Sequence, residues 1–197
     1  MHAPLLSTAL LAAGTAVAVP AAKSHGSNFA RQDNLCFIIG DVALPAETAD
    51  AAAALSNTIT CDASATTIQG VPDVTSGSTS FSSIDFSQSS QTPLDFALST
   101  FATDDVLGNS DLAFFTDALN TYLATEAGLR SIDGSLAIKV PKFFLEFQVS
   151  RIETAQGNPP TEAGLQVDHL RDKVLKNAAS EDQALLDQVT QLATQLQ

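Results

Sequence analysis

The chain has 197 residues, 45% of them hydrophobic and 16% charged, and its 22 acidic against nine basic residues give a formal net charge of −13. This composition is that of a soluble globular protein of about one domain, and it excludes a disordered chain or a long coiled coil. The acidic excess argues against a nucleic-acid partner, because contacts to phosphates need clustered lysine and arginine side chains.

An apolar run, Leu5 to Val19, stands near the start of the chain and is rich in leucine, alanine and valine. Ala16-Val17-Ala18 supply an A-x-A cleavage site, and a later cut after Ala22 also fits the pattern. The run is shorter than the roughly 20 residues that a membrane-spanning helix needs. The sequence therefore predicts a signal peptide over 1–18, a secreted extracellular protein and no membrane span.

Lys23–Asn34 is a polar stretch without a hydrophobic period, so we expect a flexible arm over 19–34, followed by a single secreted domain over 35–197. Cys36 and Cys61 are the only cysteines, and an oxidising compartment favours a disulfide between them. A catalytic thiol or a zinc site would need a nearby histidine or a second cysteine pair, which the surrounding sequence lacks. The pair is therefore predicted to be structural.

The sequence of the first part of the domain predicts a small β portion around one helix. Leu35–Val42 is a short apolar run and is expected to be a buried strand that carries Cys36. Pro45 at the first helical position, followed by the alanine-rich run Ala46–Leu55, is typical of a helix. Strand propensity returns at Thr58–Cys61, so the disulfide is expected to tie two strands that flank a helix.

Serine and threonine fill 11 of the 18 positions from Thr75 to Thr92, and Phe81, Ile84 and Phe86 are the apolar points among them. The recurring apolar residues favour short strands with serine and threonine on the outside. The composition also fits a linker open to O-glycosylation. Both interpretations stay open at this point.

The second half of the domain shows helical spacing and helix start signals. Thr92 followed by Pro93 predicts an N-cap and the first helical residue. Ser110 is expected to cap the next helix, and Gly128 is expected to end it.

The chain after this helix predicts a short extended piece over Leu136–Val140 and a buried helix over Pro141–Gln156. Two amphipathic helices close the chain, and the second opens with the capping box Ser180…Gln183. The predicted fold class is α+β, with a small disulfide-tied β portion in the first half and a mainly helical second half.

The sequence contains no motif of a known catalytic chemistry, and we predict no catalytic residue, cofactor or metal site. His169 is the only histidine of the predicted domain, and it lies at the edge of a helix beside Asp172, where a histidine is usually a surface residue. Glu126 and Glu146 lie on adjacent helical segments, but the Glu-x-x-His pairs of a di-iron site are absent.

Phe143, Phe144 and Phe147 are the candidate ligand-binding residues, because they can line a cavity for a small apolar ligand. The alternative is that all three belong to the core. A pocket of about 300 Å³ or more with convergent polar groups near them would favour ligand binding or catalysis.

Charge divides the chain, since the segment from Gln32 to Leu129 has thirteen acidic residues and no basic one. The bases of the second half include Arg171, Lys173 and Lys176 on one predicted helix, with Lys139 and Lys142 upstream of it. We interpret them as partners of the acidic half or as a solvated face, with an anion site as the alternative.

Three segments carry a resemblance to a known family: LCFIIGDVALPAE, TIQGVPDV and LATEAGLRSIDGSLAIKVPKFFLEFQVSRIETAQG. They resemble small secreted proteins of filamentous ascomycete fungi, a family without an assigned activity. The resemblance spans residues 35–157 and implies no catalytic residues.

The expected function is a secreted, non-catalytic interaction protein, effector-like or associated with the cell wall, whose partner is an unknown protein or cell-wall component. Two alternatives stay open. One is a small apolar-ligand-binding or lyase/isomerase-type protein with a phenylalanine-lined cavity, and the other is a small hydrolase that uses His169.

Overall fold

The structure is a computed structural model, and it describes residues 35–197. The predicted signal peptide and arm, 1–34, lie outside the described residues. The helices and strands follow in chain order as α2 (Ala46–Ala54), β1 (Thr60–Thr66), β2 (Pro72–Ser76), β3 (Thr79–Ser80), α3 (Pro93–Thr100), α4 (Leu112–Ser131), α5 (Lys139–Ala155), α6 (Val167–Asn177) and α7 (Gln183–Leu192).

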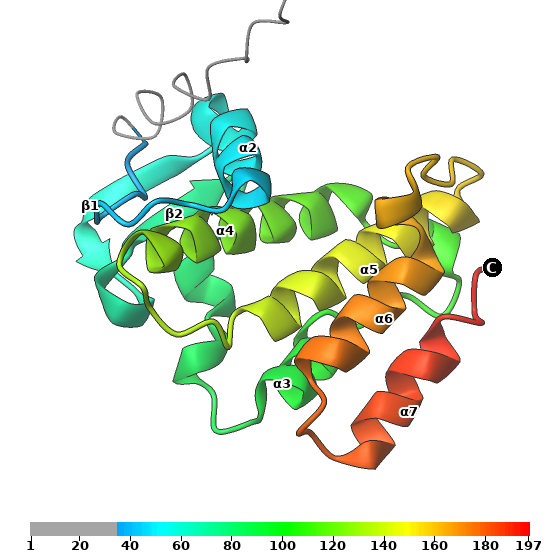
Figure 1. The fold of residues 1–197 in the computed structure, drawn as a ribbon. Helices are drawn as coiled ribbons and strands as arrows, with labels where there is room; N and C mark the ends of the chain where they lie inside the picture. The colour runs from blue at the N-terminus through cyan, green and yellow to red at the C-terminus, as the bar shows by residue number, and fades with distance from the viewer. Residues whose placement is uncertain (1–34) are drawn as a thin grey trace, which may run out of the picture.

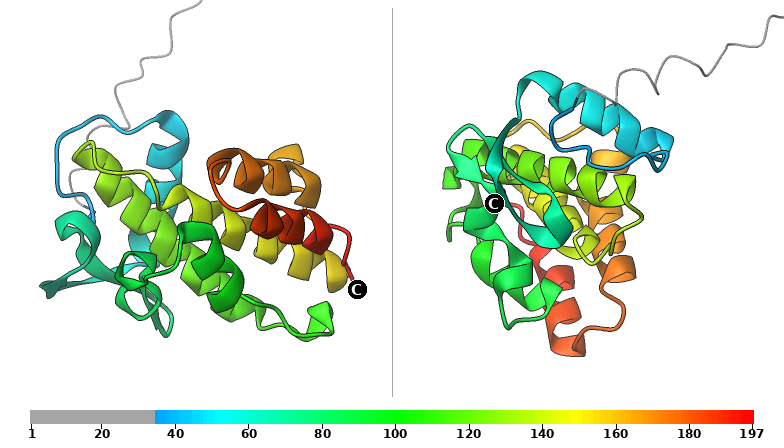
Figure 2. Two further views of the ribbon diagram at one scale, coloured as in Figure 1. Left: turned by 90° about the horizontal axis from the view of Figure 1, so that it is seen from below. Right: turned by 90° about the vertical axis from the view of Figure 1, so that its left-hand side faces the viewer.

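The strands form one antiparallel sheet in the order β1-β2-β3, and the rest of the described chain is mainly helical, which confirms the predicted α+β class. Figure 1 shows the sheet and α2 at one end of the molecule and α6 and α7 at the other. Helices α4 and α5 pack against each other between these ends, and the two further views in Figure 2 show the same order. The two long helices therefore join the β portion to the helical portion.

The segment Leu35–Val42 is not a strand, which corrects the prediction. Its backbone bonds to the end of α4 instead of to the sheet: the amides of Ile39 and Gly40 donate to the Ser131 hydroxyl at 3.1 and 3.0 Å. The amide of Val42 donates to the Ser131 carbonyl oxygen at 2.9 Å. An apolar run signals burial, but the partner that satisfies its backbone groups decides its conformation.

The predicted disulfide is confirmed, since Cys36 and Cys61 are joined with their Cα atoms 6.0 Å apart. It ties the turn before α2 to β1 rather than one strand to another. Pro45 is the N-cap of α2 rather than its first residue.

The serine- and threonine-rich stretch packs on the body of the domain. Its first residues complete β2 and form β3, and the next form single 3₁₀ turns that bury Phe81, Ile84 and Phe86. Tyr122 of α4 is fully buried, its hydroxyl donates to the Ile84 carbonyl at 2.7 Å, and its ring centroid lies 5.0 Å from that of Phe81. Burial raises the pKa of Tyr122, so this phenol remains a donor.

Helix α3 begins as predicted, with the Thr92 side chain accepting from the backbone amide of Asp95. Helix α4 begins one residue later than predicted, because Asp111 is its cap and accepts from the amides of Ala113 and Phe114. The hydroxyl of Ser110 instead accepts from the amide of Asp104 at 3.0 Å.

Gly128 does not end α4, which continues to Ser131 and so corrects the prediction. The glycine serves a close approach: a Cβ atom at this position would lie 2.6 Å from the Phe37 carbonyl oxygen and 2.9 Å from a methyl group of Val71. The same residue type that ends many helices is needed here because another backbone segment touches the helix.

The predicted extended piece 136–140 is a turn that leads into α5, with the amide of Lys139 donating to the Leu136 carbonyl at 3.1 Å. The helix predicted from Pro141 is confirmed, but it begins at Lys139. Proline fits within the first turn, where its missing amide would have no partner in the helix. The predicted capping box before α7 is also wrong, because Asp182 caps that helix by accepting from the amide of Ala184 at 2.8 Å.

We predict that Gly128→Ala destabilises the protein by about 2 kcal/mol, because overpacking against a backbone oxygen outweighs the gain in helix propensity of about 1 kcal/mol. Denaturant unfolding monitored by circular dichroism measures the free energy of unfolding. Gly164→Ala is the control, since a Cβ there meets no atom within 4 Å. A Gly128→Ala protein as stable as the wild type would contradict the proposed close approach.

Candidate functional site

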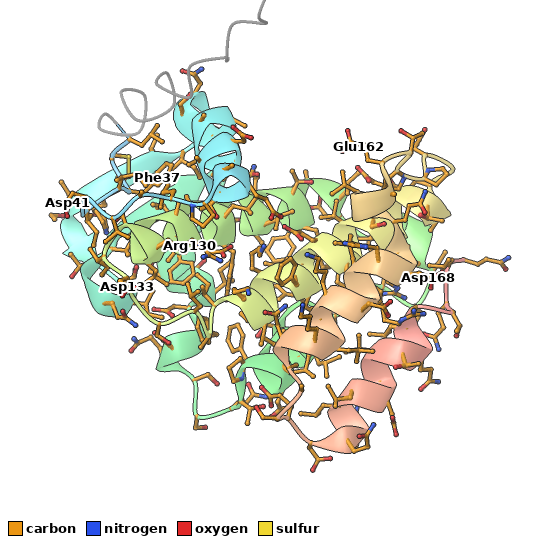
Figure 3. The ribbon with its side chains drawn as sticks, viewed as in Figure 1. Phe37, Asp41, Arg130, Asp133, Glu162 and Asp168 are labelled. Carbon is orange, nitrogen blue, oxygen red and sulfur yellow. A yellow bond between two sulfur atoms is a disulfide. The ribbon has the colours of Figure 1, made fainter. Side chains whose placement is uncertain are left out.

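A cleft with a volume of about 260 Å³ opens between α2, α4, α5 and α6. Its lining mixes apolar and charged side chains from all four helices: Glu47, Thr48, Ala51, Leu123, Glu126, Arg130, Lys139, Lys142, Phe143, Glu146 and Lys173. Figure 3 labels Arg130 near the end of α4, beside α5. Polar groups from four elements thus converge on one hollow, which is the usual arrangement of a small-molecule site.

Helix α5 supplies the floor of the cleft. Lys139, Lys142, Phe143 and Glu146 stand at positions i, i+3, i+4 and i+7, which share one face of a helix. The other faces of this part of α5 hold core residues such as Phe144 and Phe147.

A network of four charged side chains lies at the base of the cleft. The amine of Lys142 lies 3.4 Å from a carboxylate oxygen of Glu126 and 3.4 Å from one of Glu146. The guanidinium of Arg130 donates to the other oxygen of Glu126 at 2.8 and 2.9 Å. Glu126 is 4% exposed and Lys142 is 5% exposed, so each needs an opposite charge close by. Two cations and two anions balance here.

Two further lysines surround the Phe143 ring. The amines of Lys139 and Lys173 lie 5.9 and 5.5 Å from the ring centroid, and that of Lys142 lies 3.5 Å from it. Within residues 35–197, Lys139 and Lys173 form no ion pair. With Glu47 at the rim, the cleft has four cationic and three anionic side chains, so it is locally positive on a strongly acidic protein.

Burial alters the pKa of two groups in opposite directions. It raises the pKa of the Glu146 carboxyl, and the neighbouring Lys142 only partly offsets this. Desolvation lowers the pKa of the Lys139 amine, and the charges of Arg130 and of the other two lysines lower it further. A carboxyl with a raised pKa and an amine with a lowered pKa therefore share the cleft, and such opposed shifts are typical of functional sites.

The three predicted ligand-binding phenylalanines do not share a cavity. Phe143 lines the cleft, whereas Phe144 and Phe147 are fully buried and pack together with ring centroids 6.0 Å apart. His169 is exposed on α6 and is not part of the cleft lining.

The sequence pattern alone does not show that the cleft's charged residues lie together. The interpretation of second-half bases as partners of the acidic half is confirmed for Arg130 and Lys142, which both pair with Glu126. The signal that would have united them is the helical spacing from Lys139 to Glu146. It was hidden because the predicted helix began two residues too late.

A second cavity of about 360 Å³ lies between α3, α5 and α7, and Arg151 is its buried cation. The guanidinium of Arg151 donates to the carbonyl oxygens of Leu192 and Gln195, both at 2.9 Å, and to the side-chain oxygen of Gln148. Burial lowers the pKa of Arg151 to about 10, so it stays charged at neutral pH. Its donors hold the carbonyl of Leu192 at the end of α7 and that of Gln195 in the segment after it, which is a structural role. The cleft around Phe143 is therefore the candidate site.

We predict that acid stabilises the wild type relative to Glu146→Gln. Because the pKa of Glu146 is raised in the folded state, its charge costs stability at neutral pH, and this cost is relieved as pH falls through the folded pKa. The difference in the free energy of unfolding, wild type minus variant, should rise from pH 7 to pH 5 in denaturant titrations.

Glu162→Gln, at an exposed position labelled in Figure 3, is the control for the loss of a carboxylate. A wild-type-minus-Glu146→Gln difference that stays constant or falls toward acid would refute the raised pKa.

Comparison with known proteins gives a family but no activity. A family model described as a domain of unknown function (DUF7143) matches residues 38–197. No curated protein and no solved structure matches the chain. Among the described residues, none of the helices has the length and apolar character needed to cross a bilayer. The same residues hold no group of three or more histidine, cysteine, aspartate and glutamate side chains placed to bind a metal ion.

Proposed function

We propose that this chain, which belongs to the family described as a domain of unknown function (DUF7143), is a secreted protein that binds a small organic anion in the cleft around Phe143. The observation that carries the proposal is the excess of cations there. Lys139 and Lys173 add positive charge to a network that is already balanced.

The cleft has a cationic part for the charged group of such a ligand and an apolar part for its carbon skeleton. A carboxylate or phosphate can accept hydrogen bonds from Lys139 and Lys173, whose amines face the same ring. The apolar body of the ligand can lie on Phe143, Leu123 and Ala51. At about 260 Å³ the cleft is smaller than the roughly 300 Å³ set above for a ligand pocket, so the ligand that we propose is a small metabolite.

The charge of the whole molecule supports a built site rather than a general attraction. A net charge of −13 repels anions at long range. An anion therefore gains favourable electrostatic energy only where local cations exceed local acids, as they do around Phe143. The sequence suggested an apolar cavity lined by phenylalanines as one alternative. The site that we propose is instead a charged cleft with one phenylalanine.

We predict that small carboxylic acids such as benzoate and hexanoate bind, while the matched amides and alcohols do not. Lys139→Met and Lys173→Met should each weaken binding about tenfold in isothermal titration calorimetry, which corresponds to about 1.4 kcal/mol for each lost charge contact. Raising the salt concentration should also weaken it.

Lys176→Met is the matched control, because Lys176 is an exposed lysine of α6 that does not line the cleft. If no acid binds, or if the control variant loses as much affinity as Lys173→Met, the proposal is wrong.

Secretion is part of the proposal. The apolar run Leu5–Val19 with its following A-x-A site supports it, and so does the Cys36–Cys61 disulfide, because disulfides persist in oxidising compartments. The resemblance to secreted proteins of filamentous ascomycetes suggests a fungal protein that acts at the cell surface or in a host, effector-like or associated with the wall.

We predict that a yeast host releases the protein with Val19 as its first residue, or Lys23 if the later site is used. N-terminal sequencing of the medium fraction measures this. Deletion of residues 5–19 should retain the protein inside the cell. Finding the full-length chain only in the cell lysate would refute secretion.

A further inference from the structure

Lys139 differs from Lys142 in having an amine that is open to a ligand. Lys142 is 5% exposed and lies between two carboxylates, so its amine is engaged. Lys139 is half-buried in the cleft wall and has no ion-pair partner within residues 35–197. Its amine faces the same hollow as the Phe143 ring.

The surroundings of Lys139 make its charged amine release a proton more readily than the amine of a surface lysine does. Its pKa is lowered first by desolvation and then by the positive charge of Arg130, with smaller contributions from Lys142 and Lys173, while Glu126 opposes the change. Only an unprotonated amine has the lone pair that attacks a carbonyl carbon. A lysine flanked by cations in a partly dry cleft is therefore a better nucleophile at neutral pH than a lysine on the open surface.

Glu146 supplies the acid that such a reaction needs. It lies seven residues after Lys139 on the same face of α5 and lines the same cleft. Burial raises its pKa, so its carboxyl holds a proton more readily than a surface glutamate does. Loss of water from a carbinolamine needs a proton donor of this kind.

We propose that Lys139 captures a small 2-oxo acid as an imine, with the ligand's carboxylate held by the neighbouring cations of the cleft. This inference rests on the proposed function, because the anion site seats the carboxylate next to the reacting carbonyl group.

The reaction balances without a cofactor or a redox partner. The nitrogen of Lys139 bonds to the carbonyl carbon, the C=O π bond breaks, and proton transfer from nitrogen to oxygen gives a carbinolamine. The hydroxyl group then leaves as water with a proton from Glu146, and a C=N bond forms. The resulting iminium returns its proton to the carboxylate. One water is released, and hydrolysis reverses the sequence.

The test uses the secreted, disulfide-bonded protein with pyruvate and sodium cyanoborohydride, which reduces an imine to a stable secondary amine. Intact-mass measurement and peptide mapping locate the adduct. We expect one adduct per chain at Lys139, with a labelling rate that rises at lower pH than the labelling of surface lysines.

Variants separate the reacting lysine from its neighbours. Lys139→Arg keeps the positive charge and removes the nucleophile, so it should lose the adduct, and circular dichroism checks that it is folded. Lys176→Met should be labelled as the wild type is. Lys173→Met should still be labelled at Lys139, but at higher pyruvate concentrations.

Propionate distinguishes failure of this inference from failure of the proposed function, because it has the carboxylate but no carbonyl group to attack. If propionate binds and pyruvate gives no adduct at Lys139, the imine is refuted and the anion site stands. If neither acid binds, both proposals are wrong. Labelling of many lysines at equal rates, or an unchanged adduct in Lys139→Arg, also overturns the inference.

Discussion

Glu126 is a buried carboxylate on α4 and therefore requires an opposite charge nearby. The packing of α4 against α5 supplies that charge. Lys142 reaches it from α5 at 3.4 Å, and Arg130 reaches it from the next turn of α4. Removing one partner of such a pair typically costs several kcal/mol, because it leaves an uncompensated charge in a medium of low polarizability. The ion pair therefore favours the register of the two long helices in which this charge is neutralised. The sheet packs against α4, α6 packs against α5, and α7 packs against α6 and α3.

The same network explains why the cleft is chemically distinct from the core beside it. A well-packed apolar cluster would often be as stable as a buried ion pair, so the charges do not add stability by their presence alone. What they add is a polar floor beneath an aromatic ring. Phe143 lies at the boundary, with core residues such as Phe144 behind it and lysine amines in front. The side chains of α5 thus form the boundary between the apolar interior and a charged cleft.

Local signals in the sequence predicted those features that depend on neighbouring residues alone. The cap at Thr92 and the body of α5 are of this kind, and the disulfide followed from cysteine count and compartment. Features set by distant contacts could not be predicted. Gly128 resembles a helix end until Phe37 is known to touch it, and Ser131 gives no sign that it binds the chain before α2. The cleft could not be predicted for the same reason, because no pattern in the sequence shows that α4 lies beside α5.

The disulfide encloses more than a turn. Cys36 and Cys61 are 25 residues apart, and the whole of α2, with its three contributions to the cleft wall, lies between them. A protease that cuts any one peptide bond in this interval opens the backbone but leaves both new ends joined through sulfur. The wall of the cleft then stays attached to the body as a two-chain product. In a medium rich in proteases, a molecule cut in this way would thus keep all the walls of the cleft together.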